Sequence, residues 1–188
     1  MRAELRPQKL TYRDYLLFPE DGRRHEIIEG EHCVSAAPTS KHQIVLGRLH
    51  RALGGFTDER ELGEVLSPPM AVVLSEFDIV QPDLVFVSKE RLPLIDETRL
   101  NGAPDLAVEV LSPSTRRRDL SNKRRLYERA GVTEYWVLDP VNDSVEVYGL
   151  GEGGYRLEAR FSARDGDTLS SALFPDWSLS VARLFRPL

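Results

Sequence analysis

The sequence contains a single cysteine, Cys33, so an internal disulfide and a cysteine-based zinc cluster are both excluded. It also lacks long hydrophobic runs. The first ten residues contain no apolar stretch of signal-peptide length. No later segment approaches the ~20 consecutive apolar residues of a membrane span. We therefore expect a cytoplasmic protein without a membrane partner.

The chain has no excess of positive charge, because 25 Lys and Arg residues face 30 Asp and Glu residues and the formal net charge is −5. A protein that only coats DNA is normally basic, since neutralised phosphates supply its affinity. An enzyme is less constrained, because bound metal ions offset its carboxylates and its basic residues can be local. Seven of the fourteen residues from 116 to 129 are Lys or Arg. The balance thus disfavours a passive DNA binder.

The length of 188 residues suits one domain, and 41% hydrophobic with 29% charged residues is ordinary for a globular protein. Helix signals follow Thr11, run from 40 to 56 with Gly54-Gly55 at the end, and run from 116 to 130 after Ser114 or Thr115. Strand and hairpin patterns occupy 24–28, 31–36, 65–74, 84–87, 106–111, 134–138, 144–148 and 155–161. Residues 169–184 read as short strands with a terminal turn of helix. We predict an α/β (α+β) fold in a single domain, 1–188, with one mixed sheet flanked by helices and extra β-hairpins.

Glu109 interrupts the apolar run from Leu106 to Leu111. Side chains alternate along a strand, and this run is apolar on both faces, which is typical of a central strand. A carboxylate in that position is costly unless it is paired, protonated or bound to a metal. The competing interpretation is a glutamate on an edge strand that faces water.

A magnesium site needs a second oxygen ligand close to Glu109, because Mg²⁺ binds oxygen at ~2.1 Å. Three Pro-Asp pairs offer candidates, ending at Asp83, Asp105 and Asp176. Asp105 would share a strand with Glu109, and four residues at ~3.3 Å each place the two roughly 13 Å apart. Asp83 opens the preceding strand and could lie beside Glu109 in the sheet. Asp83 is therefore the better candidate.

Lys123 belongs to the inward side of the helix predicted over 116–130. Leu120, Tyr127, Ala130, Asp119 and Leu126 lie with it within an arc of about 120°. The neighbouring arginines lie opposite, except Arg116, which shares the inner arc in the first turn. An inward lysine needs a carboxylate partner or a function. A pair with Asp119, four residues earlier, is the structural alternative.

Four segments carry a resemblance to a known family: HEIIEGE (25–31), KHQIVLGRL (41–49), QPDLVFVS (81–88) and LAVEVLSPSTRRRDLSNKRRLYERAGVTEYWVLDP (106–140). They resemble the bacterial Uma family of predicted restriction endonucleases, within the PD-(D/E)xK nuclease superfamily. The resemblance runs from about residue 11 to residue 148. It implies a restriction-endonuclease-like fold and cleavage of DNA phosphodiester bonds with Mg²⁺, or Mn²⁺, as cofactor.

The resemblance also implies the roles of particular residues. Asp83 and Glu109 would hold the metal with the carbonyl of Val110, and Lys123 would act with them in catalysis. The superfamily lysine is expected two residues after the second acid, where this chain has Leu111. The resemblance transfers that role to Lys123 on the following helix. Three accessory residues complete the expectation: Glu26 or Glu29 as an outer metal ligand, and His42 as a phosphate contact.

Three functions remain open at the level of sequence. The first is an active, metal-dependent endonuclease with DNA as its partner. The second is a catalytically inactive nuclease fold that binds DNA or a protein, and the third is an unrelated β-rich interaction domain. A homodimer is also conceivable, with apolar surface around Trp136 or Trp177, although both tryptophans suit a core equally well.

Overall fold

The computed structural model describes residues 8–113 and 116–187. Its central sheet has six strands in the order β11-β10-β9-β8-β6-β3. These are β3 (Gly63–Leu66), β6 (Leu84–Ser88), β8 (Leu106–Val110), β9 (Glu134–Asp139), β10 (Ser144–Gly151) and β11 (Gly154–Ser162). Strands β8 and β9 run parallel, and the other neighbours are antiparallel. The sheet is therefore mixed, as predicted.

A second sheet has five strands in the order β2-β1-β5-β4-β7. Its strands are β1 (Arg24–Ile28), β2 (Glu31–Ser35), β4 (Ala71–Ser75), β5 (Asp78–Val80) and β7 (Arg99–Asn101). A short pair, β12 (Thr168–Leu169) and β13 (Leu179–Ser180), forms a third sheet. The prediction of one sheet was wrong. Pro68 and Pro69 have no N–H to donate, so the expected strand 65–74 breaks there and its two halves join different sheets.

The helices are α1 (Tyr12–Tyr15), α2 (Ser40–Glu59), η1 (Lys89–Leu94), α3 (Arg116–Arg118), η2 (Asp119–Lys123), α4 (Arg124–Ala130) and α5 (Val181–Phe185). Helix α2 does not end at Gly54-Gly55 as predicted. Phe56 packs against the core, and the hydroxyl of buried Thr57 donates to the carbonyl of Gly54 at 3.0 Å. Packing of the last turn therefore overrides the glycines.

The predicted helix 116–130 is not a single α-helix. Residues Asp119–Lys123 form a π-helical turn between α3 and α4, and Gly131 ends the segment in the left-handed conformation, as expected. The expected N-cap, Ser114 or Thr115, lies outside the described residues. The wider turn changes which side chains face inward, which matters for the site described below.

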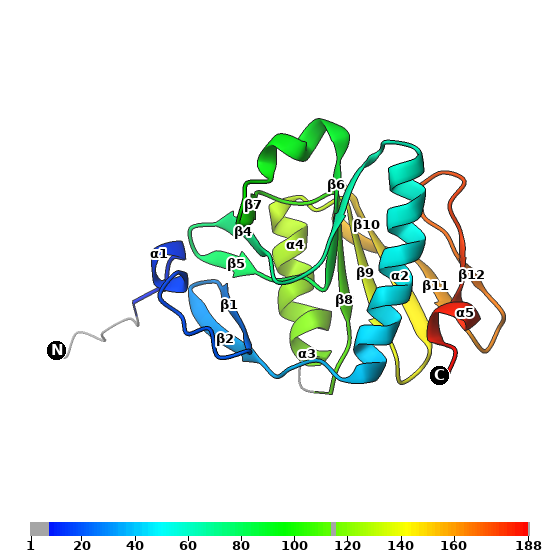
Figure 1. Cartoon of the computed structure of the whole chain (residues 1–188), viewed down its shortest axis with the longest axis horizontal. Helices are drawn as coiled ribbons and strands as arrows, with labels where there is room; N and C mark the ends of the chain where they lie inside the picture. Colours follow the sequence, from blue (N-terminus) through cyan, green and yellow to red (C-terminus); the bar gives the residue numbers. More distant parts are fainter. Residues whose placement is uncertain (1–7, 114–115, 188) are drawn as a thin grey trace.

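Two hydrophobic cores lie on opposite faces of the central sheet. One face packs against α2 through Val45, Leu49 and Leu53. The other packs against α4 and the second sheet, through residues such as Leu126 and Val80. Figure 1 shows α2 and α4 on either side of β6, β8 and β9, with the hairpin of β1 and β2 beside the end of α4 that is nearest α3. The hairpin therefore closes one end of the second face.

The expected fold class, a mixed α+β architecture of sheet flanked by helices with added hairpins, is confirmed. Trp136 and Trp177 are 0% and 5% exposed, so neither supplies surface for a dimer contact. Among the residues with described positions, no helix combines the length and the apolar character needed to cross a membrane.

Candidate active site

Asp83 and Glu109 lie opposite each other at the ends of two paired strands. Leu84 pairs with Val108 in the antiparallel β6–β8 ladder, and the Asp83 N–H donates to the Val108 carbonyl at 3.0 Å. Residues that oppose each other in such a ladder project from the same face. Here it is the face toward α4 and the second sheet. The expectation that these strands are neighbours is confirmed.

The carboxylate of Asp83 is buried and accepts three hydrogen bonds. The donors are Nη1 of Arg24 at 2.7 Å, Nε2 of His42 at 3.1 Å and the backbone N–H of Val110 at 2.7 Å. Burial raises the pKa of Asp83, but these donors outweigh it and lower the pKa to about 2. Asp83 is therefore held ionised, and its Oδ2 contacts the backbone of Val110, the residue after Glu109.

The carboxyl group of Glu109 is also buried but lies among other acids. Its Oε1 accepts hydrogen bonds from Nζ of Lys123 at 2.8 Å and the hydroxyl of Tyr127 at 2.7 Å. Burial raises the pKa of Glu109 to about 8, because the lysine only partly offsets it and the charges of Asp119, Asp83 and Glu26 add to it. Glu109 therefore holds a proton more readily than an ordinary glutamate does.

Lys123 joins Glu109 to a third acid. Its ammonium lies 2.8 Å from Glu109 Oε1 and 2.8 Å from Glu26 Oε1, and the residue is 1% exposed. Burial alone lowers the pKa of Lys123, but the negative charges of Glu109, Glu26 and Asp119 raise it above its ordinary value. The prediction that Lys123 faces inward is confirmed, with ion pairs across elements to Glu109 and Glu26.

Glu26 belongs to this cluster and Glu29 does not. Glu26, on β1, is fully buried, and its Oε1 also accepts the N–H of Gln81 at 2.9 Å. Its Oε2 is buried without a hydrogen-bond partner among the described residues. Glu29 instead lies in the β1–β2 turn with its side chain 62% exposed and paired to Arg129 at 2.9 Å. The alternation of β1 points Glu26 inward and leaves Glu29 at the turn.

The π turn sets the positions of the basic residues around the cluster. Arg118, expected on the outer side of the helix, has its side chain 18% exposed and directs Nη2 to the Ser35 hydroxyl and, at 3.9 Å, to Glu26. Arg116, expected in the inner arc, is instead 46% exposed and paired with Asp139 at 2.9 Å. A straight helical wheel misplaces both residues because it omits the extra residue of the π turn.

A cavity of about 220 Å³ opens over this cluster. Its lining combines residues of the cluster with a short connecting segment: Arg24, Ser35, Ala36, Ala37, Pro38, Thr39, His42, Asp83, Glu109, Val110, Ser112, Pro113, Arg118, Asp119 and Lys123. Within residues 8–113 and 116–187, no three His, Cys, Asp or Glu side chains are arranged as a ready metal-binding group. The cavity therefore holds acids whose negative charge is balanced by Arg24, Lys123 and Arg118.

Two residues of the site were missed in the sequence, although a signal existed for each. Tyr127 follows Lys123 by one helical turn and lay in the predicted inner arc. Arg24 lies two residues before Glu26 on β1, so both side chains project from the same face. Asp105, set aside on distance, accepts the Ser88 N–H and pairs with Arg91 instead.

Comparisons with known proteins place the chain in a family and give solved structures to which it is similar. A model of the Uma2 family, described as "putative restriction endonuclease", matches residues 12–182. The crystal structure of a putative nuclease from Anabaena variabilis is 19% identical, with 94% of this chain and 97% of that chain covered, at a TM-score of 0.78. The type IIG restriction endonuclease BpuSI is 15% identical at a TM-score of 0.44, with 81% of this chain and 17% of that chain covered. No curated protein matches the sequence.

The Anabaena likeness shows a shared fold over nearly the whole of both chains, and the BpuSI likeness is too low to support any argument. The family match covers all of the central sheet and every residue of the acidic cluster. The chain therefore belongs to the Uma2 family, whose members are described as putative restriction endonucleases.

Proposed function

We propose that the protein is a metal-dependent endonuclease that hydrolyses phosphodiester bonds in DNA at the Asp83–Glu109–Lys123 cluster. The observation that carries the proposal is the convergence of these side chains. Asp83 at the start of β6 and Glu109 on β8 line one cavity with a buried lysine from the π turn, and that lysine also pairs with Glu26 on β1. Membership of a restriction-endonuclease family supports the same chemistry.

The oxygen atoms of the cluster fit a hard divalent cation such as Mg²⁺ or Mn²⁺. Asp83 and Glu109 project from one face. Glu26 has a buried Oε2 that makes no hydrogen bond within the described part of the chain, and the positive charge of Lys123 only partly offsets the effect of burial on the pKa of Glu109. Asp83 and Glu109, with the carbonyl of Val110, would hold the ion. When bound, such an ion lowers the pKa of a coordinated water and neutralises phosphate charge.

The protein's own residues have separable parts in this scheme. Lys123, fixed by Glu109 and Glu26, orients the attacking water and stabilises the charge that develops on the phosphate. His42 and Arg24 line the cavity beside Asp83 and contact the phosphate. Tyr127 holds Glu109 in place through its hydroxyl.

One observation favours the alternative, an inactive nuclease fold that binds DNA or a protein. Both oxygens of Asp83 already accept hydrogen bonds, and Arg24 Nη1 lies 2.7 Å from Oδ1. A metal ion at Asp83 must therefore displace the guanidinium of Arg24. Metal binding decides between the two functions, because the inactive fold does not need it.

The test compares the wild-type protein with Asp83→Asn. We expect the wild type to bind Mg²⁺ or Mn²⁺ by calorimetry, to melt at a higher temperature with metal, and to cleave plasmid DNA. Asp83→Asn should lose all three responses. Failure of the wild type to bind either ion at millimolar concentration would reject the endonuclease and favour the binding module.

A further inference from the structure

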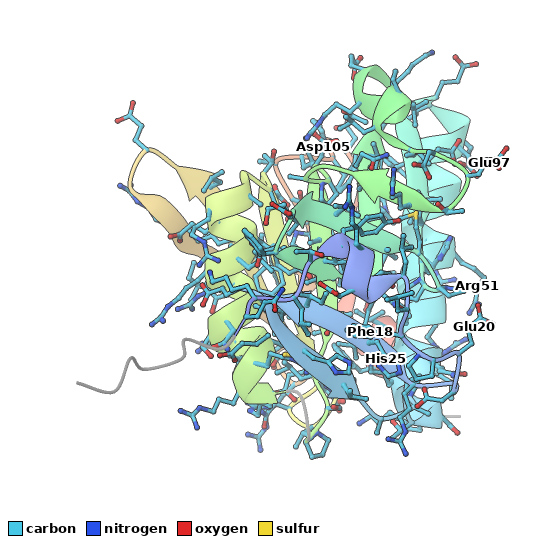
Figure 2. The ribbon with its side chains drawn as sticks, turned by 90° about the vertical axis from the view of Figure 1, so that its left-hand side faces the viewer. Phe18, Glu20, His25, Arg51, Glu97 and Asp105 are labelled. Carbon is cyan, nitrogen blue, oxygen red and sulfur yellow. The ribbon has the colours of Figure 1, made fainter. Side chains whose placement is uncertain are left out.

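A second, larger cavity of about 550 Å³ adjoins the acidic one. Its walls are the loop before β1, the segment before α2, one side of α2 and the turn at Pro68-Pro69. The two cavities share Arg24, Ala36, Ala37, Pro38 and His42. In Figure 2, Glu20 on the loop before β1 and Arg51 on α2 lie at the same edge of the molecule. Its size is within the ~300–1,000 Å³ of ligand-binding cavities.

The lining of this cavity differs in charge from the rest of the protein. It contains two arginines, two histidines and two glutamines but no Asp or Glu, counted over the described residues. The chain as a whole carries a net charge of −5. A cavity free of acids in an acidic protein favours an anionic ligand with hydrogen-bonding edges.

Arg24 and His42 connect the cavity to the proposed chemistry. Both donate to Asp83, and both line the two cavities. If Nε2 of His42 carries the proton given to Asp83, its Nδ1 is an acceptor, and this atom is buried without a partner among the described residues. Because Arg24 and His42 line both cavities, a phosphate beside Asp83 would place its attached nucleoside at the mouth of the larger cavity.

The remaining walls suit a nucleobase. Leu46, Pro68 and Pro69 offer apolar contacts, and Gln43 and His50 offer polar groups. Gly47 stands in the middle of α2, where glycine weakens a helix. A Cβ at this position would meet only Nη1 of Arg51 at 3.5 Å, so protein packing does not require a glycine there. Its lack of a side chain instead enlarges the cavity.

We propose that this cavity binds one unpaired nucleotide of DNA next to the phosphate that is cleaved. The inference rests on the proposed nuclease function and specifies its substrate. A base within a continuous duplex must first leave its pair and its stack, whereas a base in single-stranded, flapped or mismatched DNA is already free. Such DNA is therefore the preferred substrate.

The experiment fills the cavity from its helical wall. Gly47→Leu projects a side chain into it, and Gly55→Leu on the same helix is the matched control, because a Cβ there meets nothing within 4 Å and residue 55 lines neither cavity. Anisotropy in EDTA measures the binding of a labelled single strand and of the same sequence as a blunt duplex. We expect the wild type to prefer the single strand, Gly47→Leu to lose about tenfold or more in affinity, and Gly55→Leu to match the wild type.

A second variant guards against a folding defect in Gly47→Leu. Gln43 is exposed, so Gln43→Glu should fold normally while placing a negative charge in the cavity, and it should weaken single-strand binding in the same way. Equal affinities of Gly47→Leu, Gln43→Glu and Gly55→Leu would overturn the proposal, as would equal binding of single strand and duplex.

Cleavage with Mg²⁺ or Mn²⁺ is measured separately, which distinguishes the two proposals. If the wild type cuts DNA and Gly47→Leu cuts the single strand equally fast, the nucleotide cavity is wrong and the nuclease stands. If the wild type cuts nothing while binding still depends on residue 47, the nuclease is wrong and the cavity remains a nucleotide site.

Discussion

Two glutamates are buried on neighbouring strands of the central sheet, and only one lies in a site. Glu134, on β9, is 3% exposed and is surrounded by neutral donors. Its carboxylate accepts hydrogen bonds from Nε1 of Trp136 at 2.8 Å, the hydroxyl of Ser171 and the N–H of Leu173 at 3.1 Å. These bonds tie the segment after β12 to the start of β9.

Glu109, on the adjacent strand β8, is equally buried but is differently surrounded. Its donors are Lys123 and Tyr127, both at Oε1, and further acids lie close by. A buried carboxylate whose hydrogen-bonding capacity is filled by neutral donors stabilises the fold. One that shares a cavity with like charges and a lysine is costly for stability, which is typical of a functional position.

The strongest test of this difference replaces each glutamate by glutamine. Glu109→Gln should lose about 100-fold or more of metal-dependent cleavage, because the carboxyl group that would hold the metal is removed. Glu134→Gln should keep the cleavage rate but lower the free energy of unfolding by about 1–3 kcal/mol, since its amide nitrogen faces donors. Plasmid cleavage and urea unfolding of both variants measure the two effects. Loss of cleavage in both variants at equal stability would remove the distinction.

Substitution of Lys123 should give the next largest effect on cleavage. Lys123→Met should reduce cleavage about 100-fold, and it should also destabilise the protein by about 3–5 kcal/mol, because Glu109 and Glu26 lose their buried partner. Arg124→Ala is the control, since Arg124 lies over the ring of Tyr148 and lines a different cavity. Cleavage assays and thermal melting follow both. Cleavage by Lys123→Met as fast as by the wild type would show that the lysine has no catalytic part.

The sequence predicted which side chains come together better than it predicted the arrangement of the sheets. Alternation on 106–111 and the distance argument against Asp105 selected the Asp83–Glu109 pair, and both arguments depend only on strand geometry. Lys123 was found from helical spacing, and its position relative to Tyr127 in α4 follows that spacing although the turn before Lys123 is π-helical. These features are local, so short stretches of sequence determine them.

Features that depend on distant partners were not predictable. Nothing near Glu134 in the sequence reveals that Ser171 and Leu173 saturate it, so it looks like Glu109 before folding. The strands 63–66 and 71–75, on either side of Pro68-Pro69, belong to different sheets, and this depends on the strands with which each of them pairs. The π turn arises between helical segments whose sequence is compatible with a straight helix, and it brings Arg118 to the site.

The pH dependence of stability offers a smaller effect. With the pKa of Glu109 raised from 4.5 to about 8, the folded protein keeps a proton that the unfolded chain loses across this window. The free energy of unfolding should therefore fall as pH rises from about 4.5 to 8. The pKa of Asp83, lowered from 3.8 to about 2, adds stability above pH 3.8 that is lost as pH falls toward 2.

Urea unfolding across the upper window, in the wild type and in Glu109→Gln, isolates the glutamate. The variant cannot titrate at this position, so its stability should vary less with pH. Glu134→Gln should keep the wild-type slope, because Glu109 is unchanged in it. Parallel slopes in the wild type and Glu109→Gln would mean that Glu109 does not hold the proton.

The smallest effect concerns the second donor of Glu109. Tyr127→Phe removes the hydroxyl that donates to Oε1 at 2.7 Å and leaves the ring packed in the core. Loss of one buried hydrogen bond should lower the free energy of unfolding by about 1 kcal/mol.

Tyr155→Phe is the matched control, because the hydroxyl of Tyr155 donates at 2.8 Å to the backbone carbonyl of Val132. The two variants should therefore lose similar stability, but only Tyr127→Phe should slow cleavage and shift its pH profile, since only Tyr127 positions the carboxyl group. If both variants slow cleavage equally, Tyr127 acts through stability alone, and the difference between Glu109 and Glu134 rests on Lys123 and the neighbouring acids.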